Sequence, residues 1–180
     1  MTLTQQHRVA VTVVVILLGI SIIVAGFVNR IQQPRIMTVS EMRANGLFIF
    51  DTPRDPGKFV LTNHKGDEFT DQSLEGDWTL LFFGFTYCPD VCPTTLSFLA
   101  ELKGSLESTE AASTNVVMVS VDPARDTVEQ LSAYVPYFHP EFLGVTGDFP
   151  DILSFARRFN APFRKVTMED GGYQMDHSAN

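Results

Sequence analysis

Residues 78–102, WTLLFFGFTYCPDVCPTTLSFLAEL, join a short apolar strand directly to a turn that carries both cysteines of the chain. The run at 79–85 is mostly Leu and Phe, which is typical of a strand covered on both faces in a parallel sheet. Asp90 is a candidate N-cap, and Pro93 then falls in the first helical turn, where its missing N–H costs little. The stretch therefore predicts a buried strand, a cysteine turn and a helix in immediate succession.

The motif CPDVC sets the spacing of Cys88 and Cys92, so a helix that begins near Asp90 would put their sulfur atoms about one turn apart on one side. The partial positive charge at a helix N-terminus lowers the pKa of a nearby thiol and favours the thiolate. A thiolate binds soft metals and attacks disulfides, so the pair predicts metal ligation or dithiol redox chemistry. Two buried structural cysteines are the alternative, but packing does not explain why both stand together at a strand-to-helix junction.

Apolar and amphipathic segments alternate downstream of the cysteines. They predict further strands and helices, in chain order a strand at 115–121, a helix at 127–138, a strand at 142–146 and a helix at 151–159. Asp126 is the expected cap of the helix that follows it. Upstream, residues 59–69 alternate around Lys65 and predict a hairpin, with His64 as a solvated turn residue. This order favours an α/β domain with βαβ units around a central parallel sheet.

Three separated motifs, GFTYCPDVCPTTL at 84–96, VSVDPARDT at 119–127 and MDHSAN at 175–180, resemble the Sco/SenC family of membrane-anchored copper chaperones. The resemblance covers most of residues 55–180, and the motifs agree in order and approximate spacing. It implies a thioredoxin-like fold, which suits the alternating strands and helices and the leading hairpin. It also implies that the two cysteines bind one copper ion together with His177.

The same resemblance implies a function at the dinuclear copper site of cytochrome c oxidase. The chain would deliver Cu(I) or Cu(II) to subunit II of the oxidase, or to another copper-site recipient, or would reduce the recipient's cysteines. Two thiolates and one imidazole suit copper in either oxidation state and also suit zinc, so copper rests on the family. A metallochaperone is preferred, a thiol-disulfide reductase that uses Cys88 and Cys92 is the alternative, and a peroxidase-like activity of Cys88 is a third possibility.

Three aspartates are candidates for shaping the site without binding the metal. Asp90 lies between the cysteines, Asp122 and Arg125 lie in the turn after a predicted strand, and Asp176 precedes His177. Helix capping and turn formation are the simpler interpretations of Asp90 and Asp122. Asp176 could orient the His177 ring, but adjacent side chains of an extended segment point in opposite directions, which argues against this role.

Residues 9–28, VAVTVVVILLGISIIVAGFV, carry no charge, and as a helix they would span about 30 Å, the hydrocarbon thickness of a bilayer. They predict a transmembrane signal anchor, because the apolar core is longer than that of an ordinary cleaved signal peptide. Arg8 precedes the span and several arginines follow it, so the positive-inside rule alone favours a cytoplasmic domain. The family resemblance favours the opposite orientation, with the anchor in the inner membrane and the soluble domain in the periplasm.

The remaining chain is expected to form a short N-terminal flank at 1–8, a linker at 29–56 with a docking strand at 47–50, and the domain at 57–180. The net charge of −8 argues against a nucleic-acid partner, which would require a basic face. A thioredoxin-like sheet would need another strand and a closing helix after His177. The sequence therefore predicts a domain that is incomplete at its C-terminus.

Overall fold

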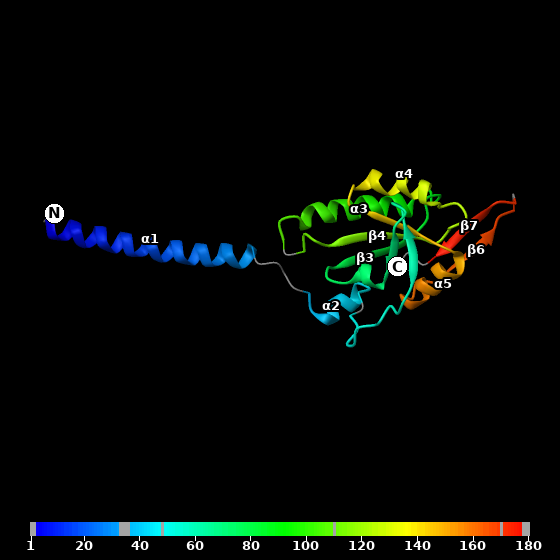
Figure 1. Ribbon diagram of the computed structural model, residues 1–180. Coiled ribbons are helices and arrows are strands. Elements are labelled where there is room, and N and C mark those ends of the chain that lie inside the picture. The colour runs from blue at the N-terminus through cyan, green and yellow to red at the C-terminus, as the bar shows by residue number, and fades with distance from the viewer. Residues whose placement is uncertain (1–2, 33–36, 48, 110, 170, 178–180) are drawn as a thin grey trace. The chain divides into compact units, whose positions relative to one another are not determined.

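The computed structural model describes residues 3–32, 37–47, 49–109, 111–169 and 171–177 (Figure 1). The chain divides into two compact units, Met1–Asp51 and Thr52–Asn180. The first unit contains α1 (Leu3–Gln32), which includes the predicted span at 9–28. Its segment His7–Ile31 has 25 residues, and an 18-residue window within it has a mean hydropathy of 3.0, so the helix is long and apolar enough to cross a membrane.

The segment after α1 contains a short helix that the sequence interpretation missed. Helix α2 (Val39–Ala44) begins with a capping box, in which Thr38 accepts from the Glu41 backbone N–H and Glu41 accepts from the Thr38 backbone N–H. The docking strand predicted at 47–50 is wrong for Leu47, Ile49 and Phe50, and residue 48 lies outside the described residues. These three residues are irregular in backbone structure, and their side chains are more than half exposed.

A five-stranded sheet in the order β2-β1-β5-β4-β3 forms the centre of the second unit. Its strands are β1 (Val60–Asn63), β2 (Glu68–Thr70), β3 (Thr79–Gly84), β4 (Asn115–Ser120) and β5 (Leu143–Thr146). Strands β3, β4 and β5 are parallel, whereas β1 pairs antiparallel with both β2 and β5. A 3-10 helix, η1 (Asp71–Leu74), connects the leading hairpin to β3. The predicted α/β class, the hairpin and the parallel pairing are confirmed.

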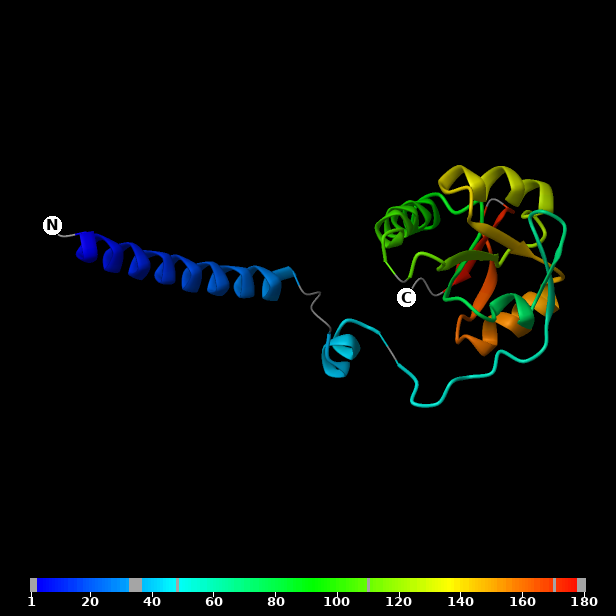
Figure 2. The same cartoon turned by 60° about the vertical axis from the view of Figure 1, so that its left-hand side comes forward.

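Helices cover both faces of this sheet, as the two views in Figures 1 and 2 show. They are α3 (Val91–Leu106), α4 (Val128–Phe138) and α5 (Phe149–Arg158). Val116 and Met118 of β4 pack in one cluster with α3 and α4, and Val117 and Val119 pack in another with α5. Strand β4 is therefore buried on both faces, as an inner parallel strand should be. The same prediction for β3 is wrong, because β3 is an edge strand and Leu80 is 36% exposed.

A second, two-stranded sheet follows α5 and was not predicted. Strands β6 (Phe163–Thr167) and β7 (Tyr173–His177) pair antiparallel, with Phe163 opposite His177. Side chains alternate along β7, so Tyr173, Met175 and His177 lie on one face. Met175 and Phe163 are buried in the core cluster that also contains α5 residues. This inner face of the hairpin therefore rests on the domain and carries His177.

Candidate metal centre

The cysteine turn lies between the end of β3 at Gly84 and the start of α3 at Val91. Cys92, in the first turn of α3, is fully buried, whereas Cys88 precedes the helix and is half-buried. The backbone N–H of Cys92 donates a hydrogen bond of 3.4 Å to the Cys88 sulfur. Asp90 occupies the N-cap position as predicted, but its side chain makes no capping hydrogen bond. The sulfur of Cys88, rather than the carboxylate, satisfies a donor at this helix end.

The pKa values of the two thiols are shifted in opposite directions. Burial raises the pKa of Cys88, but hydrogen bonds from the Cys92 thiol and from the backbone N–H groups of Cys92, Asp90 and Val91 outweigh burial and leave that pKa below its ordinary value. Burial, together with its hydrogen bond to the Cys88 sulfur, raises the pKa of Cys92 to about 12. The predicted lowering of the thiol pKa therefore holds in direction for Cys88, where the Cys92 thiol and backbone N–H groups cause it, and is wrong for Cys92. Burial in the core outweighs the helix N-terminus at the second cysteine.

Gly84 permits the close approach of β3 to the first turn of α3. A Cβ at this position would lie 3.1 Å from the Cys92 sulfur and 2.8 Å from a ring carbon of Phe82. These separations are shorter than ordinary contacts between such atoms. The absence of a side chain at Gly84 therefore lets the Cys92 sulfur sit directly against the end of the strand.

Asp126 holds the cysteine turn to the end of β4 and does not cap α4. Its buried carboxylate accepts hydrogen bonds from the Ser120 hydroxyl at 2.6 Å, the Thr86 hydroxyl at 2.6 Å and the Thr86 backbone N–H at 3.1 Å. Burial raises the pKa of Asp126, although these hydrogen bonds act in the opposite direction. Thr127 caps the helix instead, since its hydroxyl accepts from the Gln130 N–H. The predicted cap at Asp126 is therefore wrong by one residue.

Asp122 is buried beside the inner face of the β6–β7 hairpin. Its carboxylate accepts hydrogen bonds from the Arg125 guanidinium and, at 2.9 Å, from the Tyr173 hydroxyl. The turn after β4 therefore does more than reverse the chain, because it bonds to the strand that carries His177. Tyr173 is absent from the set of residues expected from the sequence, and only its position four residues before His177 on an alternating segment could have indicated it.

His177 lies at the end of β7, with its ring edge-on to the Phe85 ring at a centroid distance of 5.7 Å. Asp176 lies on the opposite face of the strand and forms an exposed ion pair of 2.8 Å with Arg164. A pocket of about 360 Å³ lies beside both residues. In the described part of the chain, no three His, Cys, Asp or Glu side chains are gathered closely enough to hold a metal ion. The structure brings the two thiols together and leaves His177 at the Phe85 ring.

Phe85 connects these two parts of the site. Its backbone N–H group donates a hydrogen bond that lowers the pKa of Cys92 against the effect of burial, and its carbonyl accepts from the Cys88 N–H at 3.2 Å. Its ring contacts His177. One residue therefore contacts both cysteines through its backbone and the histidine through its ring.

Residues 51–180 match the SCO1/SenC family model. Among curated proteins, the mitochondrial SCO1 homolog 1 of Arabidopsis thaliana is 42% identical over 159 residues, which are 86% of this chain and 48% of that protein. A putative copper-binding protein of Stutzerimonas stutzeri is 38% identical over 120 residues, 67% of this chain and 59% of that protein. The chain thus spans about half the length of the curated relatives it matches.

Solved structures of the same family share the fold. The crystal structure of Arabidopsis thaliana ScoI with copper bound aligns with a TM-score of 0.64 and 42% identity over 68% of this chain and 76% of that one. Bradyrhizobium japonicum ScoI with copper bound aligns with a TM-score of 0.63 and 41% identity over 68% and 78% of the two chains. These neighbours confirm the predicted thioredoxin-like fold. The extent of the family match and the agreement in fold show that this chain belongs to the SCO1/SenC family.

Proposed function

We propose that this chain is a copper chaperone that binds one copper ion through Cys88, Cys92 and His177 and passes it to cytochrome c oxidase, with subunit II as the recipient. The observation that carries the proposal is the pair of free thiols at the N-terminus of α3, which are hydrogen-bonded to each other and have pKa values shifted in opposite directions. Thiolates are the soft ligands that select copper among the metals of a cell. Solved relatives with copper bound support copper over zinc for this donor set.

The two cysteines contribute differently to metal binding. Cys88 has a lowered pKa and partial exposure, so its sulfur is the first donor that an incoming ion meets. Cys92 has a pKa of about 12, so the ion must displace its proton. Binding should therefore release protons and weaken as the pH falls. His177 completes the site when its ring leaves Phe85, and it is the donor that a recipient displaces most easily, because it comes from a separate hairpin.

Helix α1 would anchor this domain in the inner membrane, with the domain in the periplasm. Its apolar segment supports the anchor, and the proposed organisation is a flank at 1–8, a span at 9–28, a linker at 29–56 and a copper-binding domain at 57–180. A reporter fused after Asn180 tests the orientation, since alkaline phosphatase is active only outside the cytoplasm. Activity of a cytoplasm-only reporter at the same site would contradict the proposal.

A thiol-disulfide reductase is the second candidate, and the inequality of the thiols favours it independently of copper. The Cys88 thiolate would attack a recipient's disulfide, forming a mixed disulfide and releasing one recipient thiolate. Cys92 would then lose its proton and attack the Cys88 sulfur, forming the Cys88–Cys92 disulfide and releasing the second recipient thiolate. The recipient gains two electrons, which the dithiol loses. This chemistry uses both cysteines and does not use His177.

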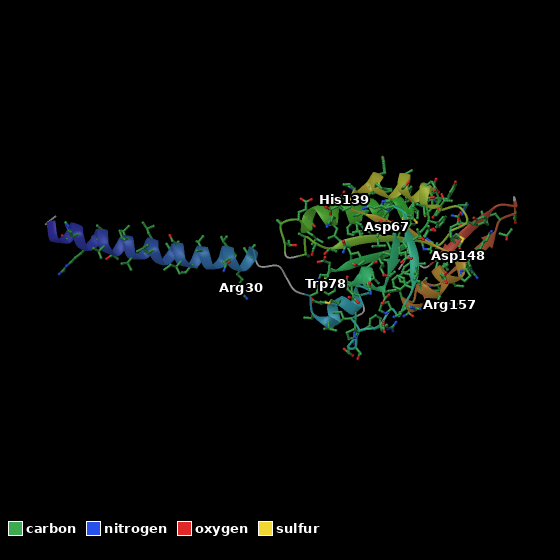
Figure 3. All side chains as sticks on the ribbon, in the orientation of Figure 1. Arg30, Asp67, Trp78, His139, Asp148 and Arg157 are labelled. Atoms are coloured by element: carbon green, nitrogen blue, oxygen red, sulfur yellow. The ribbon has the colours of Figure 1, made fainter. Side chains whose placement is uncertain are left out.

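Copper titration of the purified protein separates the two functions. We expect His177→Ala to weaken copper binding at least about tenfold, because it removes a donor, and to retain disulfide exchange. Cys92→Ser should abolish both. His139→Ala is the matched control, because His139 (labelled in Figure 3) is the C-cap residue of α4 and its ring packs on Phe142. Equal copper affinity of wild type and His177→Ala would reject the three-donor site and favour the reductase.

A further inference from the structure

The hairpin of β6 and β7 needs contacts with the rest of the domain to stay in place. A two-stranded hairpin is at best marginally stable by itself, and this one shares no hydrogen-bonded strand with the central sheet. Near its base, Phe163 and Met175 are buried in the core. Near its tip, the inner face is held by Tyr173, which pairs across the hairpin with Thr167. The contacts of Tyr173 therefore decide how firmly this face is held.

Arg125 provides those contacts together with Asp122, which accepts from the Tyr173 hydroxyl. The central carbon of its guanidinium lies 4.0 Å from the centre of the Tyr173 ring and 4.8 Å from the centre of the Tyr87 ring. The same carbon lies 5.9 Å from the centre of the Phe85 ring, which contacts His177. Tyr87 immediately precedes Cys88. One guanidinium thus joins the aromatic side chains of the cysteine turn to the strand that carries the histidine, within the range of cation–π attraction.

Buried polar contacts fix the orientation of this guanidinium. Asp122 accepts from the Arg125 Nε and from the Tyr173 hydroxyl, so one carboxylate holds both sides of the contact. The Arg125 Nη2 atom is buried and has no hydrogen-bond partner among the described residues. A donor in that state costs free energy, and the remaining contacts of the guanidinium are the aromatic rings and a long hydrogen bond of 3.5 Å from Nη1 to the Tyr173 carbonyl.

We propose that Arg125 is a positioning residue whose guanidinium holds the β6–β7 hairpin against the cysteine turn and thereby determines how readily His177 reaches the two thiols. The inference rests on the proposed function, because it concerns the third donor of the copper site. Arg125 binds no metal in this scheme and acts through His177. Loosening the hairpin spreads His177 over more positions, which lowers the fraction of molecules that are ready to bind and weakens the apparent affinity in proportion.

Arg125→Lys is the sharpest perturbation. Lysine keeps the positive charge, so the buried Asp122 retains a cation, but a compact ammonium cannot stack between rings as the planar guanidinium does. We expect amide hydrogen exchange of β6 and β7 in the metal-free protein to accelerate about tenfold, which corresponds to ~1.4 kcal/mol. Copper affinity should fall by a similar factor. Arg164→Lys is the matched control, because Arg164 lies on the same hairpin and forms an ion pair that is largely exposed.

A double-mutant cycle distinguishes positioning from a general loss of structure. In the His177→Ala background, Arg125→Lys should not weaken copper binding further, because its effect passes through the missing imidazole. Additive losses, or wild-type exchange rates in the hairpin of Arg125→Lys, would overturn the inference. Tyr173→Leu, which removes the ring and leaves Arg125 paired with Asp122, should reproduce the faster exchange. If His177→Ala itself binds copper like wild type, the proposed ligand set fails, and the exchange rates still decide whether Arg125 holds the hairpin.

Discussion

Replacing Gly84 by alanine should destabilise the domain, although it adds only one methyl group. The new Cβ would lie 2.8 Å from a ring carbon of Phe82 and 3.1 Å from the Cys92 sulfur, whereas ordinary contacts between carbon atoms are about 3.5–4.0 Å. The half-buried Phe82 ring can move aside in part, but the fully buried Cys92 sulfur has little room to do so. Overpacking of this kind typically costs about 1–3 kcal/mol.

Gly104 offers a matched control for the same substitution. It lies within α3, and a Cβ built there meets no atom within 4 Å. Gly104→Ala should therefore stabilise the domain by about 0.5–1 kcal/mol, because alanine favours a helix over glycine. The two alanine variants should then differ by about 1.5–4 kcal/mol. Urea unfolding of the metal-free protein, followed by circular dichroism, measures both values, and a Gly84→Ala protein as stable as wild type would refute the tight packing of β3 on Cys92.

Two further predictions concern buried polar groups. Burial is the main cause that lowers the pKa of His64 in the folded protein. The neutral imidazole should therefore contribute its full share to the free energy of unfolding above about pH 6.5, and this share should be lost as the pH falls through the lowered folded-state pKa. A pH series of unfolding curves should show a smaller decline in His64→Gln than in wild type. Asp126→Asn should cost about 1–3 kcal/mol, because an amide nitrogen cannot accept from Ser120 and Thr86. Asp148→Asn, at the N-cap of α5 (Figure 3) where no side-chain cap bond forms, should change the unfolding free energy much less; equal effects of the two would contradict the role given to Asp126.

The sequence predicted those parts of the fold whose signals are local. The apolar run of β3, the cysteine spacing and Pro93 in the first helical turn are all read within a few residues, and helix α3 begins where they indicate. The hairpin of β6 and β7 carries no such signal. Strand β6 reads FRKVT, and only Phe163 among its residues is buried. A segment of this kind becomes a strand because its inner face packs on a core that forms elsewhere in the chain.

Side-chain environments were predicted least well where the partners are distant in sequence. His64 was expected in solvent at a turn, yet it is 7% exposed because it exchanges hydrogen bonds with Gly144 of β5. Asp126 and Thr127 are equally good helix caps by residue type. Asp126 does not cap the helix, because its buried carboxylate instead accepts hydrogen bonds from Thr86 and Ser120. The acidity of Cys92 has the same origin, because burial in the packed core raises its pKa.

The choice between the two proposed functions depends on the hairpin more than on the cysteine turn. An accessible, acidic Cys88 beside a buried, weakly acidic Cys92 suits a metal donor pair and equally suits an attacking and a resolving thiol. Only His177 separates the two, and it belongs to a sheet that pairs with none of the central strands. Arg125 contacts Tyr173 of this sheet, and Phe85 contacts His177. We therefore expect these contacts to determine how often the imidazole lies close enough to the dithiol to bind a metal. Under the two proposals, a hairpin held against the cysteine turn would favour copper retention, and a released hairpin would leave the dithiol available for exchange.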